Sequence, residues 1–241
     1  MHPILIKLGP ITLYTYGLFL AIAFILGIYI AEKRAKEFGF EKRLILNTAF
    51  IIFIFGLIGA RLILVLSNIS AYSREPLDIL IGRSGFTLHG GILFAIIASL
   101  IYLKRKNISF LKVADCLTPS IAIGISIGRI GCLFEGCCHG KPTSLPWGIV
   151  FPKKNYSFLE FGNIPIHPTQ IYESLACLIL FFILLKIKPK KDGDIFFLFF
   201  IIYSVVRFFI EFYRDQPIFF LGLTQPQIFF IFLASVILII R

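Results

Sequence analysis

The sequence predicts an all-α integral membrane protein with seven transmembrane helices. Of its 241 residues, 58% are hydrophobic, well above the roughly 45–50% apolar share of an ordinary soluble domain. Apolar runs of about 20 residues, the length that crosses a bilayer, recur along the whole chain. Because no stretch remains that could build a soluble domain, we expect one polytopic membrane domain over residues 1–241.

The apolar runs define the predicted helices in chain order. The first run is expected to remain in the protein as a span, because it lacks a basic start and no cleavage pattern precedes the charges at 32–36. The seven predicted spans are residues 12–30, 46–66, 88–103, 114–131, 168–187, 195–213 and 226–240.

Positive charge predicts the orientation. The chain has 24 Lys and Arg against 13 Asp and Glu, a formal net charge of +11. The basic residues concentrate in the connections after the first, third and fifth spans, which the positive-inside rule places in the cytoplasm. The N-terminus is then outside and the C-terminus cytoplasmic. Since these charges lie in short loops and not in a basic arm, no nucleic-acid partner is expected.

Two long connections, 67–87 and 132–167, are predicted on the outer face. The second, between spans four and five, contains four prolines in the stretch 140–167 together with Trp147, the only tryptophan. Tryptophan favours membrane interfaces, and long loops without structure are uncommon unless functional. We therefore expect a sizeable packed outer loop lying on the membrane.

Several ionisable residues fall inside or at the edges of the spans. Each costs roughly 2.5–3.5 kcal/mol at mid-membrane, so a partner or a polar cavity is expected. Structural ion pairs near helix ends are one interpretation, but three arginines favour a functional one. Arg207 and Glu211 are spaced i, i+4 and can pair on one helix face. The residues of this group are Arg61, Arg129, Arg207, Asp115, Glu173 and Glu211.

Further polar residues lie at the outer ends of two predicted spans, 88–103 and 168–187. His89 can accept a proton or donate to a phosphate, or it can simply hydrogen-bond within the helix entry. The adjoining Gly90 and Gly91 allow another backbone or a ligand to approach closely. The stretch 167–173 adds histidine, glutamine, tyrosine and glutamate. Together with Arg129 and Arg207, these groups predict an amphipathic pocket with a positive headgroup site.

The stretch 128–140, GRIGCLFEGCCHG, combines an arginine with three cysteines. The spacing C-x4-C-C-H disfavours zinc, because strong zinc motifs use paired C-x2-C and adjacent cysteines seldom chelate one ion well. A disulfide joining Cys132 to Cys137 or Cys138 is an alternative in an oxidising compartment. A cysteine nucleophile is a third alternative, but nothing in the spacing selects which thiol would react.

The ordered motifs resemble those of the prolipoprotein diacylglyceryl transferase family over nearly the whole chain. This resemblance implies transfer of the sn-1,2-diacylglyceryl group of phosphatidylglycerol to the lipobox cysteine thiol of a bacterial preprolipoprotein, which forms a thioether and releases glycerol 1-phosphate. It also implies an active site toward the outer leaflet of the cytoplasmic (inner) membrane, and no metal or organic cofactor. The motifs are Tyr16-Gly17, His89-Gly90-Gly91, Gly128-Arg129-Ile130-Gly131, residues 167–173 and Arg207-x-x-x-Glu211.

The resemblance implies a role for each matching residue. Arg129 corresponds to the arginine that grips the phosphatidylglycerol headgroup, and Arg207 to a second essential arginine with Glu211 as its partner. His89 corresponds to a histidine proposed to help activate the thiol, with a glutamate as our second candidate for the base. The expected substrate-binding residues are Arg129, Tyr16, Gly90, Gly91, Glu135, Tyr172 and Glu173.

This chain departs from the family pattern within the cysteine-rich stretch. Family members commonly have asparagine where Cys132 stands and a functional glutamate where Cys137 stands, whereas here Glu135 lies two positions earlier. A subgroup with a G-C-x-x-x-G-C-C signature is therefore predicted, in which Glu135 is the candidate for the acidic role.

Two other functions use the same features. One is a membrane transporter or receptor for an anionic lipid or small anion, which would use the arginines without cleaving a bond. The lack of an evident internal repeat favours the enzyme. The other is a related transferase that alkylates a different thiol or uses a different phospholipid. For the leading hypothesis, the expected partners are phosphatidylglycerol, preprolipoprotein signal peptides and the lipid bilayer.

Overall fold

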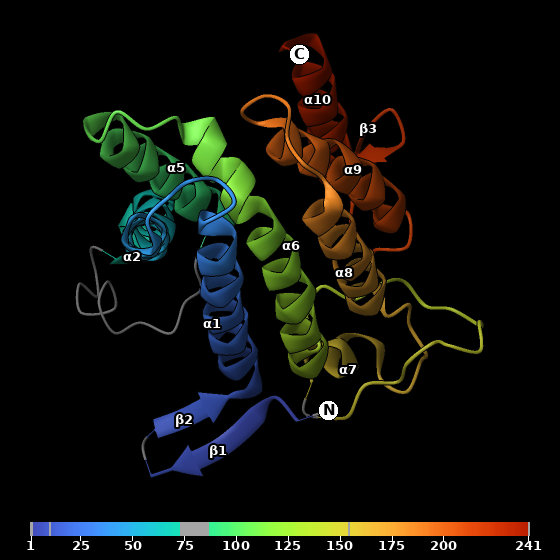
Figure 1. Ribbon diagram of the computed structural model, residues 1–241. Helices are drawn as coiled ribbons and strands as arrows, with labels where there is room; N and C mark the ends of the chain where they lie inside the picture. The colour runs from blue at the N-terminus through green and yellow to red at the C-terminus, as the bar shows by residue number, and fades with distance from the viewer. Residues whose placement is uncertain (1, 10, 73–86, 154, 241) are drawn as a thin grey trace. The chain divides into compact units, whose positions relative to one another are not determined.

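The computed structural model describes residues 2–9, 11–72, 87–153 and 155–240 (Figure 1). The chain divides into two compact units, one formed by residues 1–31 and 117–241 and the other by residues 32–116. We call them the first and second unit and describe each by itself. The single polytopic domain remains a prediction.

Seven long helices among the described residues overlap the seven predicted spans, although several of their ends differ from the predicted ones. Five of them, α1, α2, α5, α6 and α8, are long and apolar enough to cross a membrane. α9 carries three charged residues, and α10 has only 16 residues. The chain is therefore a mostly helical, multi-pass membrane protein. The helices are α1 (Thr15–Ala35), α2 (Lys42–Ser67), α5 (Leu88–Arg105), α6 (Phe110–Glu135), α8 (Thr169–Lys186), α9 (Asp194–Glu211) and α10 (Gln225–Ile240).

Two small hairpins were not predicted. β1 (Ile4–Leu8) pairs antiparallel with β2 (Ile11–Tyr14), and β3 (Ile218–Phe220) pairs with β4 (Leu223–Thr224). The prediction that the first span begins at residue 12 was therefore wrong, because β-branched residues at 4, 6, 11 and 12 favour extended backbone. The hydroxyl of Thr15 donates to the His2 carbonyl at 2.6 Å and joins this hairpin to the start of α1.

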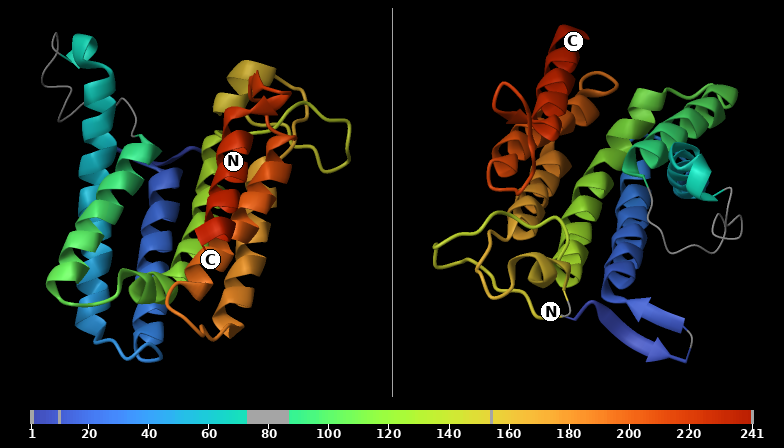
Figure 2. Two further views of the ribbon diagram at one scale, coloured as in Figure 1. Left: turned by 90° about the horizontal axis from the view of Figure 1, so that it is seen from above. Right: turned by 180° about the vertical axis from the view of Figure 1, so that it is seen from behind.

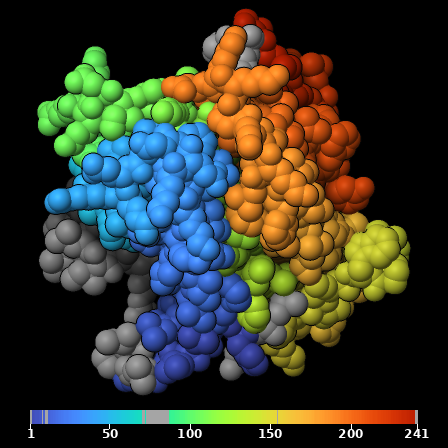
Figure 3. All heavy atoms as spheres, in the orientation of Figure 1, coloured from blue at the N-terminus to red at the C-terminus, as the bar shows by residue number. Residues whose placement is uncertain are grey.

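Large apolar side chains cover the exposed faces of the helices. Ile25 is 68% exposed, Leu93 51% and Ile179 61%. A soluble protein rarely exposes extensive apolar surface, whereas lipid tails satisfy it. Figure 3 shows α1 (blue) and α8 (orange) at the surface on one face of the molecule. These exposed faces agree with helices that contact lipid.

In the second unit, α2 and α5 pack through glycines (Figure 2). A Cβ on Gly59 would lie 2.5 Å from the carbonyl oxygen of Gly90, and a Cβ on Gly91 would lie 3.1 Å from that of Gly56. Small residues let membrane helices approach until their backbones touch. The hydroxyl of Thr87 also donates to the Ala60 carbonyl at 2.9 Å, which joins the start of α5 to α2.

In the first unit, polar side chains join neighbouring helices. The hydroxyl of Ser126 in α6 donates to the Ser174 carbonyl in α8 at 2.9 Å, and the hydroxyl of Ser174 donates to the Ser126 carbonyl at the same distance. The Gln227 side chain of α10 donates to the Phe208 carbonyl of α9 at 3.3 Å. These contacts hold α6 against α8, and α9 against α10.

The connection from α6 to α8 is packed, as predicted, over the residues that the structure describes. Gly140 N–H donates to the His167 carbonyl at 3.0 Å, and Lys141 N–H to the Tyr213 carbonyl at 2.8 Å. The short helix α7 (Tyr156–Phe161) lies within it. Figure 1 shows its yellow-green part extending away from the helices of the same unit.

The other predicted outer connection is residues 67–87. Most of it, residues 73–86, lies outside the described residues, and so do Arg74 and Arg83. Its described part ends with the one-turn helix α3 (Ile69–Tyr72). There the Arg61 guanidinium lies 5.6 Å from the centre of the Tyr72 ring.

Candidate functional site

The carboxylate of Glu173 in α8 is the centre of a buried charged network. Arg129 Nη2 of α6 lies 2.9 Å from Glu173 Oε1, and Arg207 Nη1 of α9 lies 3.2 Å from Glu173 Oε2. The Tyr203 hydroxyl of α9 also donates to Oε1 at 2.7 Å. The Glu173 side chain is only 2% exposed. One carboxylate therefore joins three helices of the first unit.

Arg207 links Glu173 to a second carboxylate. Its Nη2 lies 3.1 Å from Glu211 Oε2, so the i, i+4 pairing that the sequence predicts is confirmed. Arg214 Nε lies 3.9 Å from the same oxygen. With Arg129, the network contains three guanidinium groups and two carboxylates, which leaves one positive charge in excess. An excess of positive charge suits an anionic ligand.

Arg129 is the arginine of this network that solvent or a ligand reaches most easily. Its side chain is 20% exposed, against 6% for Arg207 and 13% for Arg214. An arginine has five N–H donors, so pairing with one carboxylate oxygen leaves donors for a phosphate. The geometry therefore agrees with an anion-binding role for Arg129.

Tyr16 of α1 lies beside the same part of α6. A Cβ on Gly131 would lie 3.1 Å from the Tyr16 ring, so this glycine allows α1 and α6 to approach closely. α6 continues to Glu135, four residues beyond the predicted end of the span at 131. Arg129 consequently lies within the last two turns of the helix, not at its end.

Sequence reasoning missed Tyr203 and Arg214, and it did not identify Glu173 as the residue shared by two arginines. One signal for Tyr203 was present, because residues 203, 207 and 211 form an i, i+4 series on one face of α9. The contacts of Glu173 with Arg129 and Arg207 had no comparable signal, because they join separate helices.

Tyr172 precedes Glu173 in sequence but contacts the outer loop. Trp147 Nε1 donates to the Tyr172 hydroxyl at 2.8 Å, and His167 Nδ1 lies 3.1 Å from the same oxygen. The Tyr213 ring packs edge-on against both His167 and Tyr172. Burial lowers the pKa of His167. These contacts give Tyr172 a structural role in anchoring the loop, and its substrate-binding role remains a prediction.

The predicted residues of α5 belong to the second unit, whereas Arg129 and Arg207 belong to the first. His89 is exposed in the first turn of α5. Gly90 and Gly91 contact the backbone of α2. The close approach that these glycines permit is therefore that of a neighbouring helix, and their substrate-binding role remains a prediction.

The cysteine-rich stretch follows the network on α6. Glu135 is the last residue of α6, and its Oε2 is buried with no hydrogen-bond partner among the described residues. Cys132, Cys137 and Cys138 are free, so the disulfide considered from the sequence is not formed. Their sulfur atoms lie within 4.8 Å of one another. Contacts with the other two thiols lower the pKa of Cys138 and raise that of Cys137.

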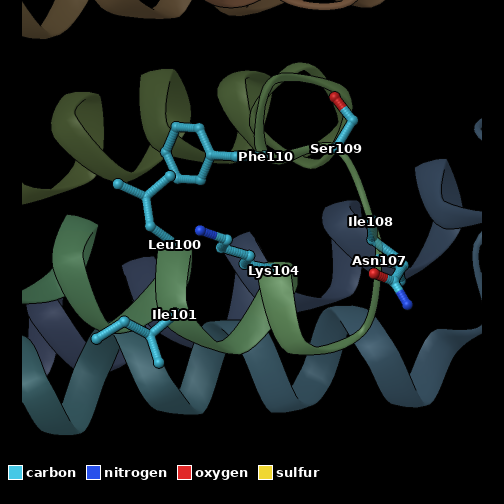
Figure 4. Close-up of a pocket in the computed structure, with 7 residues that line it drawn as sticks. All are labelled: Leu100, Ile101, Lys104, Asn107, Ile108, Ser109 and Phe110. Carbon is cyan, nitrogen blue, oxygen red and sulfur yellow. The ribbon is translucent and has the colours of Figure 1, made fainter.

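A surface pocket lies at the turn between α5 and α6 in the second unit (Figure 4). The side chains of Lys104 and Phe110 line it together with Leu100. None of the site residues predicted from the sequence lines this pocket, and it contains no carboxylate. We therefore do not assign the site to it.

Comparison with known proteins identifies the family. The family model described as prolipoprotein diacylglyceryl transferase matches residues 3–241. The chain belongs to this family. It is 36% identical to the phosphatidylglycerol–prolipoprotein diacylglyceryl transferase of Clostridium tetani, over 90% of this chain and 87% of the relative.

Two further relatives of the transferase family carry the same name. The Fusobacterium nucleatum protein is 35% identical over 98% of this chain and 96% of its own length. The Desulfotalea psychrophila protein is 37% identical over 96% of this chain and 84% of its own length. The similarity therefore covers both units.

Proposed function

We propose that this chain is a phosphatidylglycerol–prolipoprotein diacylglyceryl transferase. It transfers the diacylglyceryl group of phosphatidylglycerol to the lipobox cysteine of a preprolipoprotein. The names of its relatives support this activity. The observation that carries the proposal is the buried network between apolar helices, in which the Glu173 carboxylate of α8 contacts both Arg129 of α6 and Arg207 of α9.

The reaction forms a carbon–sulfur bond and breaks the bond between the glyceryl carbon and the phosphate oxygen. The thiol loses a proton, and the leaving group is glycerol 1-phosphate. Negative charge remains on the phosphate, and guanidinium groups held in place before the reaction stabilise it without reorganisation. The bridging carboxylate of Glu173 supplies this preorganisation, because it fixes one nitrogen of each arginine.

Arg129 binds the headgroup in this proposal. Its planar fork can contact two phosphate oxygens, which a lysine cannot do. Arg207 is buried and is held by both Glu173 and Glu211, so it adds a fixed positive charge to the site. The family resemblance supplies the other proposed site residues, which are Tyr16, Gly90, Gly91, Glu135 and Tyr172.

Two residues are candidates for the base that accepts the thiol proton. His89 is the first, from the family resemblance and because an imidazole can accept a proton. Glu211 is the second, because its Oε1 is buried and has no hydrogen-bond partner among the described residues. Variants His89→Gln and Glu211→Gln separate the two, since loss of the base lowers the rate of transfer more than it weakens lipid binding.

The proposed topology has seven spans, an outer N-terminus and a cytoplasmic C-terminus. Basic residues in the connections after α1, α5 and α8 support it through the positive-inside rule. The active site then faces the outer leaflet of the bacterial inner membrane. Preprolipoprotein signal peptides would reach it from that leaflet.

Reconstitution tests the proposal directly. Purified protein in vesicles that contain phosphatidylglycerol is given a lipobox peptide, and mass spectrometry follows the peptide while a chemical assay follows glycerol 1-phosphate. We expect a thioether product and an equimolar amount of released glycerol 1-phosphate. The Arg129→Ala variant should give neither, and Arg105→Ala, an exposed arginine at the far end of α5, is the matched control.

The same experiment separates the transferase from the alternative functions. Folded protein that binds phosphatidylglycerol but releases no glycerol 1-phosphate would contradict the proposal and indicate a transporter or receptor. A thioether formed on a different thiol, or formed from a different phospholipid with release of that lipid's own phosphorylated headgroup, would instead indicate the related transferase.

A further inference from the structure

Three cysteines of the first unit converge at one point. Cys132 is buried in the last turn of α6, and Cys137 and Cys138 are half-buried just after it. All three sulfur atoms lie within 4.8 Å of one another. Neither the charged network nor the transfer reaction uses these thiols.

The backbone after α6 brings the third thiol into the cluster. Gly136 has φ +81° and Cys138 has φ +59°, both in the left-handed region. Gly136 N–H and Cys137 N–H both donate to the Cys132 carbonyl, at 2.9 and 3.2 Å. The chain therefore turns back over the end of α6. Adjacent cysteines in a regular strand would point apart, and this turn removes that objection to a shared ligand.

Side chains from other elements hold this turn in place. Gln170 Nε2 donates to the Cys137 carbonyl at 2.7 Å, and the Thr169 hydroxyl to the Cys138 carbonyl at 2.8 Å. The Ser157 hydroxyl donates to the Gly136 carbonyl. A Cβ on Gly136 would lie 2.8 Å from the Asn155 side chain. The three thiols therefore stand on a backbone that is fixed from α7 and α8.

We propose that Cys132, Cys137 and Cys138 form a binding site for a soft metal ion, Cu(I) or Zn²⁺. Thiolate sulfur selects these ions over hard cations. Zinc bonds sulfur at about 2.3 Å, which requires only a modest contraction of the cluster, and a water molecule can complete its coordination. Cu(I) can bind the three sulfur atoms alone. Binding releases the thiol protons to solvent.

Three thiols favour a metal over a disulfide. A disulfide joins two of the sulfur atoms and leaves the third thiol unbonded, whereas a metal ion can bind all three. Cys138 also adopts a positive φ, which is uncommon for a residue other than glycine. This conformation is explained if the Cys138 thiol must face the other two.

The three cysteines lie close to the charged network along the chain. Cys132 lies three residues after Arg129 on α6, and Gln170, which holds the turn, lies three residues before Glu173 on α8. A bound ion would fix the turn against the end of α6, and Thr169 and Gln170 connect this turn to α8. Metal binding itself does not depend on the transfer reaction, so the two proposals can fail separately.

Metal titration of the full-length protein tests the site. Protein purified in detergent under reducing conditions is titrated with Cd²⁺, which gives an ultraviolet thiolate charge-transfer band. Separate titrations with Zn²⁺ and with Cu(I), in competition with a chromophoric chelator, distinguish the two ions. We expect about one ion per chain, and at least about tenfold weaker binding in the Cys132→Ala and Cys138→Ala variants. Cys177→Ala, a buried cysteine of α8 outside the cluster, should bind as the unaltered protein does.

A labelling experiment on the unaltered chain keeps the test independent of how the variants fold. Metal-loaded protein should protect Cys137 and Cys138 from alkylation, while the labelling of Cys177 stays unchanged. No charge-transfer band, or equal binding by Cys132→Ala, would overturn the proposal. A disulfide between two of the three cysteines in protein isolated without reductant would also overturn it.

Discussion

Two sets of helix contacts in this protein differ in kind, because one is made by glycines and the other by buried charged side chains. In the second unit, α2 and α5 meet through Gly56, Gly59, Gly90 and Gly91, and their backbones touch. In the first unit, α6, α8 and α9 meet around the Glu173 carboxylate, with Arg129 and Arg207 on either side.

The glycine contact needs no explanation beyond helix packing, whereas the charged contact does. Glycine contacts gain van der Waals energy without burying a charge, so they suffice where helices only need to associate. Burying ions costs several kcal/mol each, and apolar residues of similar volume often stabilise a protein as well or better. Stability alone therefore does not account for the buried cluster of three arginines and two glutamates, whereas the proposed anionic ligand does. Four predictions test this comparison, and a fifth concerns the outer loop beside it.

The Glu173→Gln variant should have the largest effect. It removes the charge that Arg129 and Arg207 share, and breaking a buried ion pair costs about 3–5 kcal/mol. We expect a marked fall in the thermal unfolding temperature in detergent and loss of thioether product. The Glu160→Gln control breaks the pair with His139, but Glu160 is 53% exposed, so a change within about 1 kcal/mol is expected. Equal unfolding temperatures for the two variants would contradict a central role for Glu173.

The Arg129→Lys variant should separate activity from stability. It retains the charge beside Glu173 but loses the planar fork that can contact two phosphate oxygens. We expect about 10²–10³-fold slower transfer, as for removal of one preorganised donor, with an unfolding temperature near that of the unaltered protein. Arg105→Lys, at an exposed site, should leave the rate unchanged. A fully active lysine variant would show that charge alone is sufficient.

The Gly59→Ala variant tests the glycine contact. The added Cβ would lie 2.5 Å from the Gly90 carbonyl oxygen, and overpacking of this kind costs about 1–3 kcal/mol. The matched control is Gly124→Ala in α6, where nothing lies within 4 Å of the added Cβ. There the higher helix propensity of alanine should stabilise by up to about 1 kcal/mol. Unfolding temperatures that change in the same direction in both variants would contradict the close approach of α2 and α5.

The Tyr203→Phe variant should weaken the network without breaking it. It removes one hydrogen bond to Glu173 and leaves both ion pairs, so the expected loss is about 1 kcal/mol of stability. Transfer should slow by less than in Arg129→Lys. Tyr156→Phe, at a 69% exposed position, is the control and should have no effect. A larger loss of activity than in Arg129→Lys would assign Tyr203 a direct role in the reaction.

The smallest predicted effect is a pH dependence from the outer loop. Burial lowers the pKa of His167, so the folded protein takes up its proton at lower pH than the unfolded chain does. This contribution to stability is fully present above the unfolded pKa of about 6.5. It is lost as the pH falls from there through the folded pKa. Unfolding temperatures measured from neutral to acidic pH should fall less steeply in His167→Gln, while the exposed His2→Gln control keeps the original slope.

Much of the fold could be predicted because its signals are local. Runs of apolar residues located the long helices of the described residues, and five of these helices have the length and apolar character that crossing a bilayer requires. Errors occurred at the ends, where Ile11–Tyr14 forms a strand and α6 runs on to Glu135. Element ends depend on contacts of a few residues, such as the hairpin partner of β2, which hydropathy does not encode.

For the site, the sequence alone determined which charged residues the membrane helices carry and that Arg207 pairs with Glu211 within one helix. Only the tertiary structure decided that Glu173 is shared by Arg129 and Arg207, that three thiols meet beyond α6, and that Gly90 and Gly91 face α2. The physical reason is the range of the contacts. A helical repeat places residues four apart on one face, whereas the Arg207–Glu173 contact joins residues 34 positions apart on neighbouring helices.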